Sequence, residues 1–223
     1  MAYVSGSSGT GSTPKGLTVQ NGDTVFVATI KDIQVLQKGK KLIQEKTKFT
    51  PSAIAANPAV SGEFAVGAEV PTFLVFKLTT QDTKVYVYAY SGSSITLKTT
   101  LTSTRAQVTA LSFSPSGDFL AVGDSSGKII LYAVSSEEYT VKTSRWSFHV
   151  SRITALEFNP TGTHCVSGSL DTNVYIWSTQ NVGKYIAIKG ASKDGVWGVN
   201  WIGDTKIASS GGDAAVKIWD VTI

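Results

Sequence analysis

The sequence has little of the chemistry that cysteine and histidine supply: its 223 residues include one cysteine, Cys165, and two histidines. A single cysteine excludes a disulfide within the chain and a zinc site built from several cysteines. The longest apolar runs have the length of a strand, well short of the roughly 20 residues that span a bilayer. No charged segment followed by an apolar run marks a signal peptide. We therefore expect a cytoplasmic protein without a membrane partner.

Charge is also sparse. Charged residues make up 16% of the sequence and hydrophobic residues 42%, the reverse of the balance that keeps a chain disordered. The net charge of +4 looks thinly spread, and the one tight basic cluster consists of Lys38, Lys40 and Lys41. Because nucleic-acid-binding domains concentrate Lys and Arg on one face or along a helix, we expect no nucleic-acid partner. A mildly positive chain suits an acidic protein partner.

Motifs of metal and phosphate chemistry are missing. The sequence contains neither a His-Glu-x-x-His pair nor a glycine-rich phosphate loop that ends in Gly-Lys-Ser/Thr. His164 lies near a predicted turn with no second histidine close to it in the sequence, so it is expected to be an ordinary polar residue and not a metal ligand. We therefore expect no catalytic residue, no metal, no cofactor and no small-molecule substrate.

A repeat of roughly 45 residues organises the second half of the sequence. Val108–Phe113 (VTALSF) is echoed by Ile153–Phe158 (ITALEF) and more loosely by Val196–Trp201 (VWGVNW), at spacings of 45 and 43 residues. Later strand-like runs keep the same phase: Lys128–Tyr132, Asn173–Trp177 and Ala215–Trp219. This period, with four short strands in each unit, is typical of the blades of a β-propeller. We therefore predict an all-β propeller.

The repeat divides the chain into five units, near residues 14–51, 52–106, 107–150, 151–194 and 195–223. Each unit should contain four strands, except the last, which ends after its third strand and lacks the outer one. Proline and glycine in Ser114–Asp118 and Asn159–Thr163 supply the dihedral angles of tight turns. Residues 1–13, rich in Gly and Ser, are expected to be flexible. Residues 70–81 are expected to be an insertion in a turn, either an extra strand or translated intron sequence.

The fourth unit resembles the WD-repeat family of propellers. It carries the polar set of that family: His149, Ser167, Asp171 and Trp177. The resemblance implies that these side chains form one hydrogen-bonded chain within the blade. Ser, His and Asp together also suggest a hydrolase triad, but Ser167 lies in a predicted strand and not on a Gly-x-Ser-x-Gly turn. We therefore predict a structural tetrad and no enzyme.

From about Ser12 onward, the chain resembles the C-terminal propeller of the actin-interacting protein 1 family. Residues 108–122, 168–177 and 206–219 carry the resemblance. It implies two linked seven-bladed propellers that bind actin filaments decorated with cofilin and promote their severing and disassembly at the actin cytoskeleton. Five units of a seven-blade template do not close a ring, so we expect a partial propeller. A WD-repeat adaptor in another protein complex is the alternative.

Loops at the ends of a rigid propeller are natural places for partner contacts. Arg105, Arg152 and Lys193 each lie just before a predicted inner strand, so they are the candidate partner-binding residues. Trp197 is assigned to the core of its blade, with a surface contact as the alternative.

Overall fold

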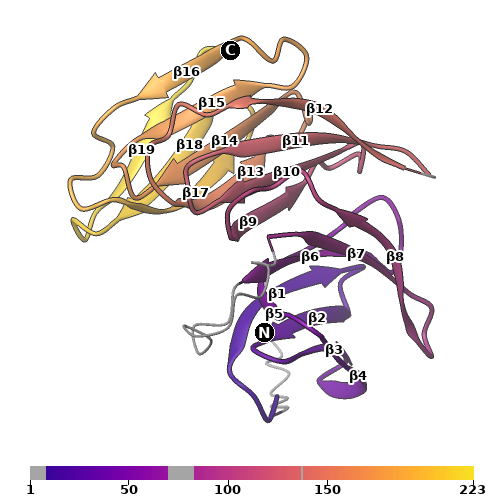
Figure 1. Cartoon of the computed structure of the whole chain (residues 1–223). Helices are drawn as coiled ribbons and strands as arrows, with labels where there is room; N and C mark the ends of the chain where they lie inside the picture. Colours follow the sequence, from indigo (N-terminus) through magenta and orange to yellow (C-terminus); the bar gives the residue numbers. More distant parts are fainter. Residues whose placement is uncertain (1–8, 70–82, 137) are drawn as a thin grey trace.

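In the computed structural model of the chain, residues 9–69, 83–136 and 138–223 are described. Over these residues the chain forms nineteen β-strands and no helix (Figure 1). In this part of the chain there is thus no helix that could cross a membrane. The strands form five antiparallel sheets that follow one another along the sequence, four of them with four strands and the last with three. This confirms the predicted all-β class and the partial set of propeller blades.

Each sheet is one blade, numbered here from the N-terminus. Blade 1 contains β1 (Pro14–Gln20), β2 (Thr24–Thr29), β3 (Asp32–Gln37) and β4 (Lys40–Lys46). Blade 2 contains β5 (Thr50–Ala56), β6 (Glu63–Glu69), β7 (Val85–Tyr90) and β8 (Ile95–Leu101). Blade 3 contains β9 (Val108–Phe113), β10 (Phe119–Asp124), β11 (Ile129–Val134) and β12 (Tyr139–Trp146). Blade 4 contains β13 (Ile153–Phe158), β14 (His164–Ser169), β15 (Val174–Ser178) and β16 (Tyr185–Ile188). Blade 5 contains β17 (Val196–Ile202), β18 (Lys206–Gly211) and β19 (Val216–Asp220).

Successive blades pack through their first, innermost strands: β1 lies beside β5, β5 beside β9, β9 beside β13, and β13 beside β17. The blades therefore form an arc that is not closed, with blades 1 and 2 in the lower part of Figure 1 and blades 3 to 5 in the upper part. The predicted insertion at 70–81 and most of the predicted flexible segment 1–13 lie outside the described residues, and the unit boundaries stay predictions.

The hydrophobic core lies between neighbouring blades. One cluster joins Val87 of blade 2 to Leu120 and Ile130 of blade 3, and the next joins blade 3 to blade 4. Glycine allows this close packing at one position in the second strand of a blade. A Cβ added at Gly123 would lie 2.6 Å from Cγ2 of Ile153 in the next inner strand. The bare backbone of Gly123 therefore sets how closely blade 4 approaches blade 3.

Candidate functional site

Two sets of loops lie at the end of the blades where the inner strands begin, here called the loop end. The first set connects each outer strand to the next inner strand, at residues 47–49, 102–107, 147–152 and 189–195, and the second set joins the second and third strands of each blade. The same type of backbone hydrogen bond joins the two sets in blades 3, 4 and 5: Ser125 N–H to Gln107 O (2.9 Å), Leu170 to Arg152 (3.1 Å) and Gly212 to Gly195 (3.0 Å). In blade 1, Ile30 N–H donates in the same way to the carbonyl of Thr13, which precedes the first inner strand (3.0 Å). The loops are thus held by the blades that they connect.

The three candidate partner-binding residues lie on successive loops of this end. Arg105 precedes blade 3, Arg152 precedes blade 4 and Lys193 precedes blade 5. All three are exposed, and none forms an ion pair with a residue of the described part of the chain. The structure therefore places three positive charges without an ion-pair partner among the described residues at the loop end, each on a different loop. Their contact with a partner stays a prediction.

Two exposed apolar side chains lie at the same end: Val150, which sequence reasoning missed, and Trp197, for which a surface position was the alternative to the core. Val150 is 84% exposed, and its N–H donates to Oδ2 of Asp171 at 3.0 Å, so the loop presents it in a fixed position. Trp197 is 59% exposed, so its assignment to the core is wrong. The strand register shifts between Val196 and Gly198. A bulge of this kind re-aims a side chain, and Trp197 has no partner residue on β18.

The structure brings the four residues of the predicted tetrad together in blade 4. Trp177 Nε1 donates to Ser167 Oγ at 2.8 Å, and His149 Nε2 lies 2.8 Å from the same oxygen. His149 Nδ1 lies 2.9 Å from Oδ2 of Asp171. With a neutral imidazole, the indole N–H of Trp177 donates to Ser167 Oγ, the Ser167 hydroxyl donates to His149 Nε2, and His149 Nδ1–H donates to Asp171. Each donor therefore has an acceptor. Ser167 has no exposed surface, so its hydroxyl is inaccessible to a substrate.

Burial and hydrogen bonding set the charges of this tetrad. Burial lowers the pKa of His149, although Asp171 acts in the opposite direction, so the ring is neutral at neutral pH. Burial by itself would raise the pKa of Asp171. Backbone N–H groups of Asn173 and Val150, together with His149, outweigh that effect and hold the pKa of Asp171 below its ordinary value. The tetrad therefore contains a neutral imidazole and an ionised carboxylate.

This arrangement predicts that the folded chain loses stability as the pH falls below about 6.5, the ordinary pKa of histidine. The unfolded chain takes up a proton on His149 near that pH, whereas the folded chain, with a lowered pKa, takes it up only at lower pH. The unfolded state then binds more protons, which costs up to about 1.4 kcal/mol per pH unit. Urea unfolding at two pH values, above and below 6.5, measures the loss.

The chain has two histidines, so each can be tested alone. We expect His149→Gln to lose less stability than the unmodified chain over the same pH interval. His164 is half-buried and burial also lowers its pKa, so His164→Gln measures how much the second histidine contributes to the same pH dependence. An unchanged pH dependence in His149→Gln would contradict the assigned charge state.

Blade 5 fills the tetrad positions with a different set of side chains. Trp219 Nε1 donates to Ser209 Oγ at 2.9 Å, as in blade 4. Ala191, however, stands where the spacing places the histidine. Lys217 Nζ donates instead to the Ala191 carbonyl (2.6 Å) and to Oδ2 of Asp213 (2.7 Å). The loop before the blade is thus still joined to its turn, through a lysine.

A second buried polar cluster joins blades 2 and 3, and sequence reasoning missed it. The side chain of Glu63 on β6 is 3% exposed and accepts hydrogen bonds from Lys98 Nζ (2.5 Å), Tyr139 Oη (2.7 Å) and Asn57 Nδ2 (2.8 Å). Burial alone would raise the pKa of Glu63, but these donors and the charge of Lys98 lower it. Burial and the neighbouring carboxylate raise the pKa of Tyr139. The only sequence signal is a carboxylate at the start of an apolar strand.

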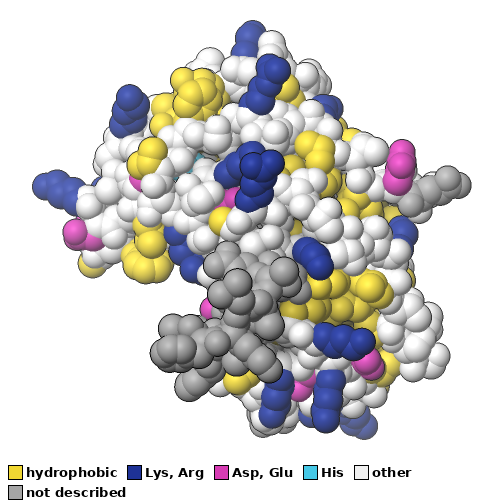
Figure 2. All heavy atoms as spheres, viewed as in Figure 1, with side chains coloured by type: hydrophobic (Ala, Val, Ile, Leu, Met, Phe, Trp, Pro, Cys, Tyr) yellow, Lys and Arg dark blue, Asp and Glu magenta, His cyan; other side chains and the backbone are white. Residues whose placement is uncertain are grey.

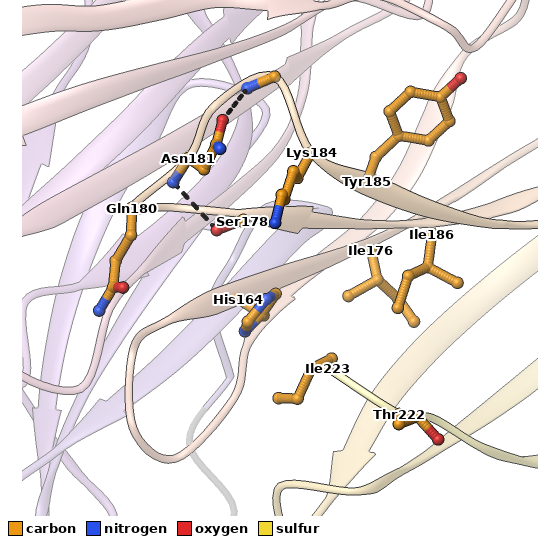
Figure 3. Close-up of a pocket in the computed structure, with 11 residues that line it drawn as sticks. His164, Ile176, Ser178, Gln180, Asn181, Lys184, Tyr185, Ile186, Thr222 and Ile223 are labelled. Atoms are coloured by element: carbon orange, nitrogen blue, oxygen red, sulfur yellow. Dashed lines mark hydrogen bonds between the residues drawn. The ribbon is translucent and has the colours of Figure 1, made fainter.

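A cavity of about 540 Å³ lies against the outer strands of blade 4, beside the chain end that follows β19. Figure 3 shows Ile176 and Ile186 next to each other there, with His164 and Ile223 nearby. The lining side chains include no Asp, Glu or Cys. Within the described residues no group of His, Cys, Asp and Glu is suited to hold a metal ion.

Comparison with known proteins agrees with the blades. A model of the WD40 domain of anaphase-promoting complex subunit 4 matches residues 71–154, and the WD domain, G-beta repeat model matches residues 140–178 and 183–220. Together these WD models cover more than half of the chain.

Curated relatives match almost the whole chain. An uncharacterized WD repeat-containing protein of Schizosaccharomyces pombe is 38% identical over 90% of this chain and 31% of its own length. Actin-interacting protein 1 of Drosophila melanogaster is 31% identical over 93% of this chain, and that of Caenorhabditis elegans is 32% identical over 94%. The chain spans about a third of the length of these relatives, 32% for each of the latter two. With its repeat, its sheets and these matches, the chain belongs to the WD-repeat family.

Proposed function

We propose that this chain is a non-enzymatic actin-binding scaffold that works with cofilin to promote the severing and disassembly of actin filaments. Its place of action would be the cytoplasm, at the actin cytoskeleton. The observation that carries the proposal is the similarity to two proteins named actin-interacting protein 1, which extends over more than nine-tenths of the chain. The WD-repeat fold alone would not carry it, because one fold hosts many functions.

The geometry supports binding over catalysis. In our proposal the tetrad is a structural tie of blade 4, since Ser167 is fully buried and its hydroxyl is shared between Trp177 and His149. The loop end supplies Arg105, Arg152 and Lys193 as the proposed partner contacts. Loops that present exposed cations at the same end as the exposed Trp197 suit a protein partner, since aromatic residues and Arg are enriched at interfaces.

A WD-repeat adaptor in another complex is the second candidate function. The relative from Schizosaccharomyces pombe favours it, because its name records WD repeats and no actin. The two candidates differ in the partner and share the blades.

Co-sedimentation with actin filaments, with and without cofilin, tests the proposal. We expect the chain to pellet with filaments, and to a greater extent when cofilin decorates them. Replacing Arg105, Arg152 and Lys193 together by alanine should weaken pelleting about tenfold, the loss expected for a few interface contacts. Pelleting that cofilin does not increase contradicts the proposed function and favours the adaptor.

A further inference from the structure

The net charge of the chain is concentrated in one short stretch. Residues 31–48 contain two acidic residues, Asp32 and Glu45, and six lysines: Lys31, Lys38, Lys40, Lys41, Lys46 and Lys48. The whole chain has 20 basic and 16 acidic residues, so 14 of each lie outside this stretch and cancel. The entire net charge of +4 therefore belongs to these 18 residues. This corrects the view of a thinly spread excess.

The fold places these lysines along the outer edge of blade 1. They lie on β4, the last strand of its sheet, and on the turns at its two ends. Lys38 and Gly39 both have positive φ, 49° and 76°, as a two-residue hairpin turn requires. At the other end, the Lys31 carbonyl accepts a hydrogen bond from the N–H of Thr47 at 3.1 Å. At 3.4 Å per residue, the ribbon from Lys41 to Lys46 is about 17 Å long.

All six lysines are exposed, and none forms an ion pair with a residue that the structure describes. Figure 2 shows Lys and Arg side chains gathered over the lower part of the molecule, where Figure 1 places β3 and β4. Asp32, the acidic residue nearest to the first lysine, is buried and hydrogen-bonded to Thr29, Gln34 and Gln44. The exposed charges of this ribbon are therefore six lysines and one carboxylate, that of Glu45.

Protection of a sheet edge does not account for this concentration. Lysine on an edge strand prevents pairing with another chain, and four blades of this chain have such an outer strand. The outer strand β4 carries three lysines, β8 one, β12 one together with an arginine, and β16 none. The outer strands of blades 2, 3 and 4 are protected with at most two positive charges each. The three lysines on the outer strand of blade 1 therefore exceed what edge protection needs.

The residue types select the class of partner. Residues 31–48 contain no arginine and no aromatic residue, and the exposed large apolar side chain on β4 is Leu42. Single-stranded nucleic acids are held by basic residues together with aromatic stacking, and amphipathic segments bind membranes with an apolar face beside the charges. Lysine is a hydrated point charge that steers an oppositely charged surface over long distances. We propose that this lysine ribbon, residues 31–48, is a docking surface that captures an acidic protein surface.

The inference goes beyond the proposed function and does not depend on actin as the partner. Its test is fluorescence anisotropy of a labelled poly-glutamate peptide titrated with the full chain, at low and at physiological ionic strength. The ribbon variant is Lys40→Gln/Lys41→Gln/Lys46→Gln. The matched control is Lys142→Gln/Lys184→Gln/Lys189→Gln, which removes three exposed lysines on or beside the outer strands of blades 3 and 4.

We expect the unmodified chain to bind the peptide and to lose affinity as salt is added. The ribbon variant should bind about tenfold more weakly, whereas the control should stay within about twofold of the unmodified chain. Glu45→Lys, which adds a charge to the same strand, should tighten binding. This gain of affinity tests the ribbon even if the triple variant does not fold.

Several results would overturn the inference. One is equal loss in the ribbon variant and the control, which would indicate a general charge effect. Another is binding that salt does not weaken, or no binding at low salt. Tighter binding to single-stranded DNA or to phosphatidylserine vesicles than to poly-glutamate would assign the ribbon to a nucleic acid or a membrane. Because no actin is present, failure of filament binding leaves this test unaffected.

Discussion

Replacing Trp177 by alanine is expected to lower the free energy of unfolding by about 3–5 kcal/mol, the usual range for a buried aromatic side chain. Trp177 is 1% exposed, and its ring stacks on Trp146 with the centroids 5.4 Å apart. Truncation leaves a cavity between blades 3 and 4. It also removes the N–H that donates to Ser167, which stays buried with one polar partner fewer. Urea unfolding followed by circular dichroism measures the change.

The matched control is Trp219→Ala in blade 5. Trp219 occupies the same position and donates to Ser209, but its side chain is only half-buried. Less apolar surface is returned to water there, so we expect a loss of about 1–2 kcal/mol. Equal losses in the two variants would show that burial in the tetrad does not distinguish blade 4 from blade 5.

The inner strands of the later blades were predictable because the repeat is local and strict. The runs Val108–Phe113 and Ile153–Phe158 are the observed β9 and β13, with the same bounds. The third-strand run Asn173–Trp177 differs from β15 (Val174–Ser178) by one residue at each end. Such strands follow from apolar alternation and from turns with Pro and Gly, which neighbours in the sequence determine. The tetrad could be found for the same reason, since its four residues lie close together in the sequence, between residues 149 and 177.

Contacts between blades could not be predicted in this way. Tyr139 and Glu63 are 76 residues apart, and nothing in either local pattern marks them as partners. From the sequence alone, Lys217 is expected to be a solvated charge, whereas in the fold its ammonium group donates to the Ala191 carbonyl. Trp197 fits the core pattern of an inner strand, and one bulge exposes it. Each case depends on register or on the approach of two blades, which a single sequence does not encode locally.

The ion pair of Glu63 with Lys98, both in blade 2, supports the second large prediction. We expect Lys98→Met to lower the free energy of unfolding by about 2–4 kcal/mol at neutral pH, because it leaves the buried carboxylate of Glu63 without its cation. Lys98 keeps part of its side chain in water, so the loss falls below that of a fully buried pair. Lys206→Met is the control: its ion pair with Asp220 is exposed, and its removal should cost no more than about 0.5 kcal/mol.

The pH dependence of this loss identifies its cause. In the unmodified chain the pKa of Glu63 lies below its ordinary value of 4.5, so the carboxylate contributes stability above pH 4.5 that is lost as the pH falls through the lower folded pKa. Without Lys98, the lowering effects of its hydrogen bond and its charge are lost, so the pKa of Glu63 rises from its value in the unmodified chain. The folded variant then loses less stability than the unmodified chain as the pH falls, and the difference between the two should shrink.

The double variant Glu63→Gln/Lys98→Met separates charge from packing. An amide keeps an acceptor for Tyr139 and Asn57 but carries no charge, so it needs no cation. We expect the double variant to be more stable than Lys98→Met alone at neutral pH, and the two to converge in acid. If Lys98→Met loses the same stability at every pH, and the amide restores none of it, then the lysine acts through its aliphatic stem. In that case the lysine would contribute packing alone, and the neutral donors Tyr139 and Asn57 would suffice for the buried carboxylate of Glu63.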